Sequence, residues 1–238
     1  MLSRTPDMAG DPLDPSQLYR LMAWLSPSFP VGAFSYSSGL EWAVEAGDVT
    51  DAATLRRWLQ TVIAQGNGFC DGVFFVQGHR AVAGKDQGLL HMVAELAAAF
   101  TPSKERQLET TAQGQAFLQT VQAAWSCDAV ERFAGSWSGA VAYPVAVAVT
   151  AAGHGVPLEP ALHAYLHAVA ANLISAGVRL IPLGQTDGQR LLAALQETIQ
   201  ETCDRALAAT LDDLGSAAFR ADLASMRHEN QYTRLFRS

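Results

Sequence analysis

Apolar residues recur at steps of three and four along most of the chain. The pattern is clearest in residues 103–125, where it includes Leu108, Leu118 and Trp125, and it recurs in residues 187–211. This spacing places side chains on one face of an α-helix. Both segments are therefore predicted to be amphipathic helices with one face on a core.

The same reasoning predicts helices along most of the remaining chain. Asp51 is a good N-cap for a helix that carries Leu55, Leu59 and Val62 on one face. Further helices are expected near residues 16–25, 70–82, 87–99 and 217–229.

One long stretch is nearly uncharged: between Arg132 and Arg179 the only charged residue is Glu159. A run of this length raises the question of membrane spans. Its residues are mainly small, however, and prolines and histidines interrupt it. Helices that are apolar on all sides also form the centre of large soluble bundles. Two buried, alanine-rich central helices are therefore predicted at residues 138–152 and 159–181, and no membrane span.

No linker divides the chain, and no internal repeat is evident. Val145, Val147 and Val149 alternate with alanine as in a short strand, but no partner strand is evident and a helix is preferred. The sequence therefore predicts an all-α fold, a single-domain bundle of about ten helices over residues 16–238. Residues 1–15 are rich in Pro, Gly and Asp and are predicted to be a disordered lead outside this domain.

Composition excludes several classes of protein. A formal net charge of −7 argues against nucleic-acid binding, which would require a basic face. The three cysteines, Cys70, Cys127 and Cys203, lie far apart and form no C-x-x-C motif, so neither a disulfide framework nor a structural zinc site is expected. A reducing, cytoplasmic compartment fits this pattern best.

Motifs of catalysis are missing from the sequence. It contains neither a G-x-x-x-x-G-K-[ST] phosphate loop nor an H-E-x-x-H metal motif. The segment 135–139 has Trp137 where the serine of a G-x-S-x-G elbow would stand. Ser38 and Glu41 instead match a capping box, in which the hydroxyl caps the next helix. No catalytic residue and no cofactor are therefore predicted.

His163 and His167 lie four residues apart, so a helix would place both imidazoles on one face. Two imidazoles at this spacing can share a metal ion, but no third ligand lies between them. On a buried helix such residues are more often hydrogen-bonded core or interface residues, so no metal site is assigned. A direct metal carrier or a helical enzyme that uses this pair remains the alternative function.

Residues 225–238 stand out because they carry three arginines against one glutamate, together with Tyr232, Leu235 and Phe236. Arginine and aromatic residues are enriched at binding hot spots. If a partner covers this tail, deletion of residues 228–238 is expected to leave the fold and its melting temperature nearly intact. The alternative is that the end of the chain packs Leu235 and Phe236 onto its own core.

Three segments of the chain resemble the urease accessory protein F (UreF) family: residues 26–41, 179–189 and 225–238. They occur in the family's order, and the resemblance extends from about residue 18 to residue 238. It implies an all-helical protein that dimerises and has no catalytic activity of its own.

The resemblance also implies partners: the urease accessory proteins D (also called H) and G, of which G is a GTPase. Together they deliver nickel to apo-urease, whose active site also needs a carbamate on a lysine. The F protein bridges D/H and G in this maturation complex, which makes it a nickel-insertion chaperone. An exposed arginine supplied to the GTPase in trans is a further hypothesis, and the sequence does not select one.

By the same resemblance, the tail contacts the D/H partner and helps to form the surface for G. This role falls on Arg227, His228, Tyr232, Arg234, Leu235, Phe236 and Arg237. The segment 26–41 is expected to shape the neighbouring partner surface, through Phe29, Pro30, Phe34 and Tyr36.

Overall fold

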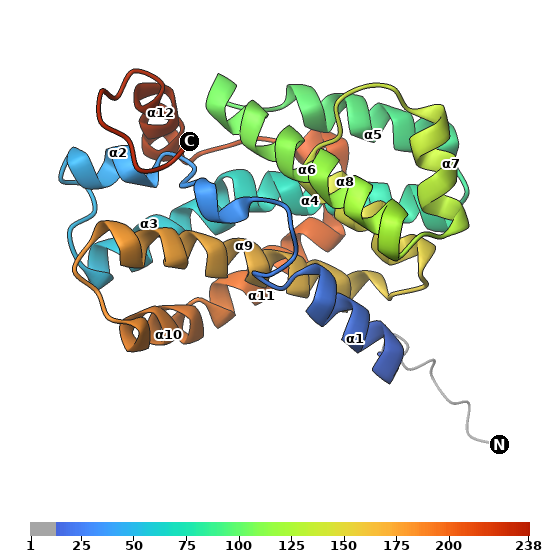
Figure 1. Cartoon of the computed structure of the whole chain (residues 1–238), viewed down its shortest axis with the longest axis horizontal. Helices are drawn as coiled ribbons and strands as arrows, with labels where there is room; N and C mark the ends of the chain where they lie inside the picture. Colours follow the sequence, from blue (N-terminus) through green and yellow to red (C-terminus); the bar gives the residue numbers. More distant parts are fainter. Residues whose placement is uncertain (1–12) are drawn as a thin grey trace.

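The computed structural model describes residues 13–238, and all regular secondary structure in this part of the chain is helical (Figure 1). The elements are α1 (Pro15–Trp24), η1 (Ala33–Ser35), α2 (Leu40–Glu45), α3 (Ala52–Gln65), α4 (Asn67–Ala83), α5 (Gln87–Ala99), α6 (Lys104–Ala124), α7 (Asp128–Ser136), α8 (Tyr143–Gly153), α9 (Leu158–Leu180), α10 (Gln185–Ala194), α11 (Gln196–Ala208), η2 (Leu211–Asp213) and α12 (Phe219–His228). The predicted all-α fold is confirmed.

The disordered lead predicted for residues 1–15 lies largely outside the described residues, but its last part belongs to α1. Asp14 caps this helix by accepting hydrogen bonds from the N–H groups of Ser16 and Gln17, at 2.7 and 3.0 Å. Pro15 occupies the first helical position, where its missing N–H costs no bond. The folded part therefore begins slightly earlier than predicted.

The central helix of the molecule is α8. All eight residues from 144 to 151 are buried, and α8 contacts α4, α5, α6, α7 and α9. Because helices surround it, α8 needs no polar stripe, and its valines and alanines fill the space between its neighbours. This confirms the central helix predicted at residues 138–152, although the helix starts later, at Tyr143.

The second predicted central helix is not fully buried, so that prediction is wrong. One side of α9 is open to solvent, and His167 and Ser175 on that side are exposed. By length and composition α9 could cross a membrane, but half of its most apolar window is buried inside the protein. The other enclosed helix is α4, whose Gly72 would place a Cβ atom only 3.1 Å from Ala206 of α11. Glycine there permits the close approach of α11 that buries α4.

The helix predicted over residues 187–211 is divided at Leu195 into α10 and α11. The Leu195 N–H group is shared between the carbonyl oxygens of Leu191 and Leu192, at 3.1 and 3.2 Å, as is common where helices end. After the break, α11 packs against α3, α4 and α9, whereas α10 packs against α3 and α9. The periodic pattern continues through the break because both helices bury one apolar face.

The capping box predicted at Ser38 and Glu41 is not formed. Ser38 has a left-handed φ of 53°, and its hydroxyl donates to Glu109 of α6 at 3.0 Å. The N–H of Glu41 donates instead to the hydroxyl oxygen of Ser37, at 3.3 Å. The Ser38 side chain therefore joins α6 to the segment 26–41.

Close approach between α2 and α12 depends on Gly39. Its φ is 80°, and a Cβ atom there would lie 2.5 Å from the backbone nitrogen of Ser225. In Figure 1, α12 and the C-terminal residues lie beside α2. The segment 26–41 and the tail are thus brought together by backbone packing.

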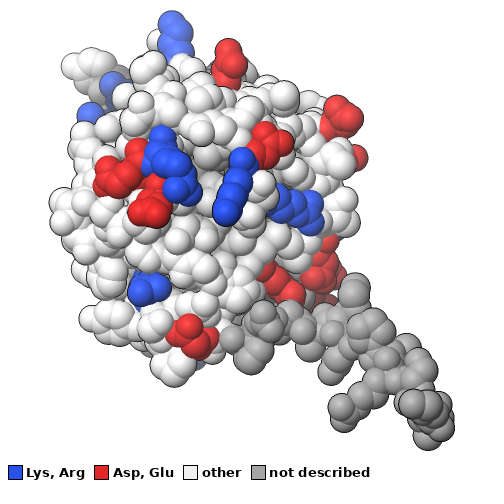
Figure 2. Space-filling model, turned by 90° about the vertical axis from the view of Figure 1, so that its right-hand side faces the viewer, with Lys and Arg blue, Asp and Glu red and all other residues white. Residues whose placement is uncertain are grey.

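On the face shown in Figure 2, blue basic and red acidic side chains are scattered among uncharged residues. No continuous basic stripe crosses this view. Side chains of both signs are therefore mixed on this face.

The thiols give a first testable prediction. Burial raises the pKa of Cys70 to about 11 and that of Cys203 to about 12, whereas Cys127 is partly exposed. The thiolate is the reactive form. At pH 8 we expect an aromatic disulfide reagent to modify one thiol quickly, and Cys127→Ser to remove this fast phase. Rapid modification of all three cysteines in the folded protein would contradict the prediction.

The sign of the pH effect follows from the same shifts. Both thiols keep their protons in the folded state to a higher pH than in the unfolded chain, whose ordinary thiol pKa is 9.0. Their contribution to stability is therefore complete below about pH 9 and is lost as pH rises through the folded values. Replacement of both by alanine should reduce this alkaline loss in a denaturant titration.

Candidate partner-binding site

The C-terminal tail folds back over the segment 26–41 of its own chain. The N–H of Arg237 donates to the carbonyl of Ser35 at 2.8 Å, and the N–H of Ser37 donates to the backbone oxygen of Ser238 at 2.7 Å. The N–H of Phe236 donates to the carboxylate of Glu41 at 2.9 Å. Two segments that are far apart in the sequence therefore form one surface.

His228, at the end of α12, lies between two carboxylates and is fully buried. Its Nε2 atom lies 3.0 Å from Glu41 of α2, and its Nδ1 atom lies 2.6 Å from Glu105 of α6. Both ring nitrogens of His228 therefore have a carboxylate partner inside the protein. The second oxygen of Glu105 accepts from Arg234 at 2.7 Å. This cluster ties α2, α6, α12 and the tail together.

A second buried polar cluster surrounds Glu109 of α6. Its carboxylate accepts from the hydroxyls of Ser38 and Ser238, at 3.0 and 2.9 Å, and pairs with Arg106 at 3.3 Å. Arg106 also pairs with Asp71 at 2.8 Å. Burial raises the pKa of Asp71, although Arg106 opposes the shift. The cluster anchors the last residue of the tail to the core of the bundle.

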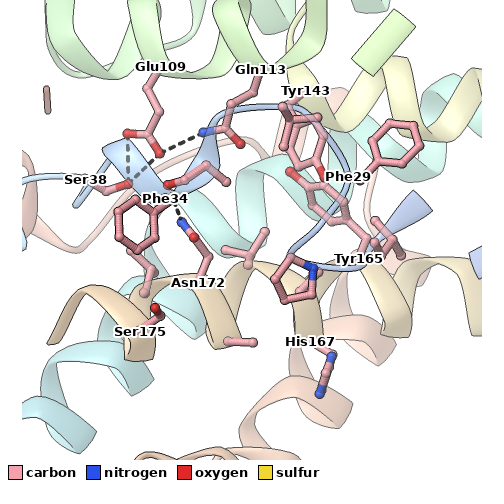
Figure 3. A pocket seen from close by; sticks show the side chains of 18 of the residues that line it. Phe29, Phe34, Ser38, Glu109, Gln113, Tyr143, Tyr165, His167, Asn172 and Ser175 are labelled. Carbon is pink, nitrogen blue, oxygen red and sulfur yellow. Dashed lines mark hydrogen bonds between the residues drawn. The ribbon is translucent and has the colours of Figure 1, made fainter. Parts of the chain in front are cut away.

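Beside this cluster is a cavity of about 250 Å³. The labelled side chains in Figure 3 come from the segment 26–41, α6, the start of α8 and α9. Phe29 packs in its wall against Phe117, with ring centroids 5.0 Å apart. Tyr165 donates to Asp71 at 3.1 Å, so these two polar groups of the cavity wall bond to each other. Ser38, which also lines this cavity, donates a hydrogen bond from its hydroxyl to Glu109 at 3.0 Å.

The third segment with family resemblance meets the other two at Arg179. Its guanidinium carbon lies 3.7 Å from the ring centre of Phe34 and 4.3 Å from that of Phe236. Burial lowers the pKa of Arg179. Residues 26–41, 179–189 and 225–238 therefore share a single site.

The structure divides the predicted partner-binding residues into two groups. The exposed members are Pro30, Phe34, Arg227, Tyr232, Arg234, Leu235 and Arg237. The others are buried or half-buried: Phe29, Tyr36, His228 and Phe236. The first group is available to another protein, whereas the second holds the tail and the segment 26–41 in place.

The expectation that the tail contributes little to the fold is therefore corrected. Phe236 is 4% exposed and His228 is 0% exposed. Sequence reasoning missed the carboxylates that hold the tail: Glu41 and Glu105, which bind His228, and Glu109, which binds Ser238. One signal was present, because Glu105 and Glu109 lie four residues apart on one helical face, where like charges repel unless something neutralises them.

His163 and His167 lie on α9, and His167 also lines the cavity beside the segment 26–41. His163 is half-buried and His167 is exposed, so neither is a core residue, whereas the alternative that they lie at an interface stays open. Within residues 13–238, no group of three or more His, Cys, Asp or Glu side chains is arranged to hold a metal ion. The structure supplies the pair with no third ligand.

Comparison with known proteins shows the family of the chain. The family model UreF matches residues 49–196. A protein of Rhodopseudomonas palustris (strain HaA2) named urease accessory protein UreF is 64% identical over 236 residues, which cover 98% of this chain and 100% of the relative. Proteins with the same name from Bradyrhizobium diazoefficiens and Bradyrhizobium sp. (strain ORS 278) are 59% and 61% identical, over 100% and 99% of this chain and 99% and 97% of their own lengths.

The fold and the site define an all-helical protein whose three distinctive segments converge on one surface. The chain belongs to the UreF family and is therefore a urease accessory protein.

Removal of the His228 side chain is predicted to cause a large loss of stability. His228→Ala removes one hydrogen-bond partner from each of the buried carboxylates of Glu41 and Glu105, and a hydrogen bond to a charged group is worth about 1.5–3 kcal/mol. For a chain of this size we expect the melting temperature to fall by about 10 °C. Tyr232→Ala, at a side chain that is 102% exposed, is the control and should melt like the wild type. A His228→Ala protein that melts with the wild type would show that the cluster does not hold the tail.

The histidine pair on α9 gives a separate prediction. His163→Ala/His167→Ala should leave the nickel affinity of the isolated protein nearly unchanged, because two imidazoles without a third ligand form a weak site. Isothermal titration with Ni²⁺ measures this directly. Since both residues are at least partly exposed, the double variant should fold, and a tight site that it abolishes would favour the carrier hypothesis.

Proposed function

We propose that this protein is a non-catalytic scaffold in urease maturation. It joins the accessory protein D/H to the GTPase G and so helps to deliver nickel to apo-urease. Membership of the UreF family supports this role, since the relatives are named as accessory proteins of urease. The observation that carries the proposal is the convergence of all three distinctive segments on one surface.

The chemistry of that surface suits a protein partner. Tyr232 is 102% exposed, Phe34 67% and Leu235 65%, and Arg227 and Arg237 lie exposed beside them. Large exposed apolar groups are a liability unless a partner covers them. Aromatic and arginine side chains dominate binding hot spots because they bury a large area with few rotatable bonds.

The buried half of the site supports the same role. The carboxylates of Glu41, Glu105 and Glu109 fix the backbone of the tail, so its exposed side chains are held in one arrangement before a partner arrives. A preorganised surface binds more tightly because less conformational entropy is lost on association. D/H is the partner that we place on this surface, and G binds the composite surface that results.

We further propose that the scaffold is a homodimer in the cytoplasm. The open side of α9 is the element that supports a dimer, since its partly exposed Ala164, Ala168 and Ala171 would allow a second copy to approach closely. Regulation of the GTPase by an exposed arginine remains part of the hypothesis.

The alternative is that the protein carries nickel itself, or acts as a helical enzyme, through His163 and His167. The exposure of His167 favours access for a metal ion. The scaffold is preferred because, within residues 13–238, no group of three or more His, Cys, Asp or Glu side chains is arranged to hold a metal ion.

The scaffold proposal predicts that exposed tail residues control binding and leave stability unchanged. Tyr232→Ala/Leu235→Ala should weaken binding to purified D/H by about thirty-fold or more, the effect of a hot spot worth about 2 kcal/mol. The melting temperature should stay at the wild-type value because both side chains are exposed. Met92→Ala on α5, where the side chain is 57% exposed, is the matched control and should bind normally.

Binding is best measured by titration of labelled D/H, followed by capture of G and activation of apo-urease in a reconstituted mixture. The double variant should fail in all three assays at concentrations where Met92→Ala succeeds. Normal urease activation by Tyr232→Ala/Leu235→Ala would overturn the assignment of this surface.

A further inference from the structure

Arg179 has an unusual environment for a charged side chain. Phe34 and Phe236 both contact it, with ring centres 3.7 and 4.3 Å from the guanidinium carbon. Its Nε atom donates to the backbone carbonyl of Ser175 in α9, at 3.2 Å. The guanidinium thus forms cation–π contacts with two aromatic rings.

The hydrogen bonds of the same guanidinium are incomplete. The Nη2 atom of Arg179 is buried and has no hydrogen-bond partner within residues 13–238. Aromatic rings satisfy the faces of a guanidinium but do not accept its in-plane N–H groups in strong bonds. A buried donor without an acceptor is costly, and more so when it is charged.

Other arginines of this region differ in that respect. Arg106 pairs with Asp71 at 2.8 Å and with Glu109 at 3.3 Å. Arg234 pairs with Glu105 at 2.7 Å. Arg179 forms no such pair among the described residues, so the carboxylates of this site are committed elsewhere.

The missing acceptor identifies what would complete the site. A planar guanidinium matches a carboxylate best, because two parallel N–H···O bonds can form. Arg237 is exposed nearby, with its guanidinium carbon 5.9 Å from the centre of the Tyr36 ring, and adds positive charge to the rim. Both cations favour an acidic group from outside the chain.

Of the two rings that contact Arg179, only Phe34 is exposed. This ring is 67% exposed and belongs to the short η1 turn, which follows Gly32 at a left-handed φ of 72°. Since the ring contributes little to the core, it can turn aside without a loss of internal packing. The Phe236 ring is buried and keeps its contact with the guanidinium.

We propose that Arg179 receives an aspartate or glutamate side chain of the D/H partner, with Phe34 and Leu235 packing around the incoming residue. The inference rests on the proposed function and deepens it, because it names the residue that recognises the partner and the chemistry of the partner's group. Arg179 is then a specificity residue of the interface, and its contacts with Phe34 and Phe236 hold the guanidinium in position.

The test compares variants of the full chain in titrations with purified D/H. Arg179→Gln removes the charge and should weaken binding by about thirty-fold or more, as expected for a truncated interfacial charge pair. Arg179→Lys keeps the charge without the planar fork and should fall between Arg179→Gln and the wild type. Arg56→Gln, at an exposed arginine of α3, is the matched control and should bind normally.

Charge reversal separates recognition from a merely structural role. Arg179→Glu should abolish binding. Substitution of one acidic residue of D/H by Lys should restore it, and this residue is found by changing the Asp and Glu positions of D/H to Lys one at a time. A tail that is simply displaced could not be rescued in this way. Should Arg179→Gln prove unstable in a thermal melt, the comparison of Arg179→Lys with the wild type and the reversal pair decide the question.

The outcomes are distinguishable. If the wild-type chain does not bind D/H at all, the proposed function fails and this inference falls with it. If the wild type binds but Arg179→Gln binds equally well, or no reversal in D/H restores Arg179→Glu, the inference is wrong while the scaffold proposal stands.

Discussion

The arrangement of the partner-binding site depends on the buried carboxylate of Glu41. It accepts hydrogen bonds from the backbone N–H groups of Leu235 and Phe236, at 2.6 and 2.9 Å, and from the ring of His228, at 3.0 Å. A buried charge is tolerated only where partners replace its lost hydration. Because the tail and α12 supply all three donors, Glu41 and the tail stabilise each other.

The helical bundle behind the site makes this arrangement rigid. α8 is enclosed by its neighbours, and α4 and α6 pack directly against it. α6 then presents Glu105 and Glu109 to the tail, so the position of the C-terminal residues is set by the deepest part of the core. A change in the packing of the core would therefore shift the C-terminal residues, although these lie far from it in the sequence.

The tail combines two roles at alternating positions. Phe236 and Ser238 are buried, whereas Leu235 and Arg237 are exposed. In an extended segment successive side chains point to opposite sides, so one side of the tail can bind the protein while the other faces outward. Stability and recognition are thus carried by neighbouring residues, which explains why deletion of the whole tail cannot separate them and single substitutions can.

The sequence by itself determined the helical class, the central helix α8 and the three segments that characterise the family, because periodicity and local composition are properties of neighbouring residues. It did not determine that α9 has an open side or that residues 187–211 break at Leu195, since both depend on which helices pack together. Nor did it show that Glu41, Glu105 and Glu109 hold the tail, or that Arg179 contacts both Phe34 and Phe236. These contacts join residues far apart in the chain, and only tertiary packing brings them within bonding distance.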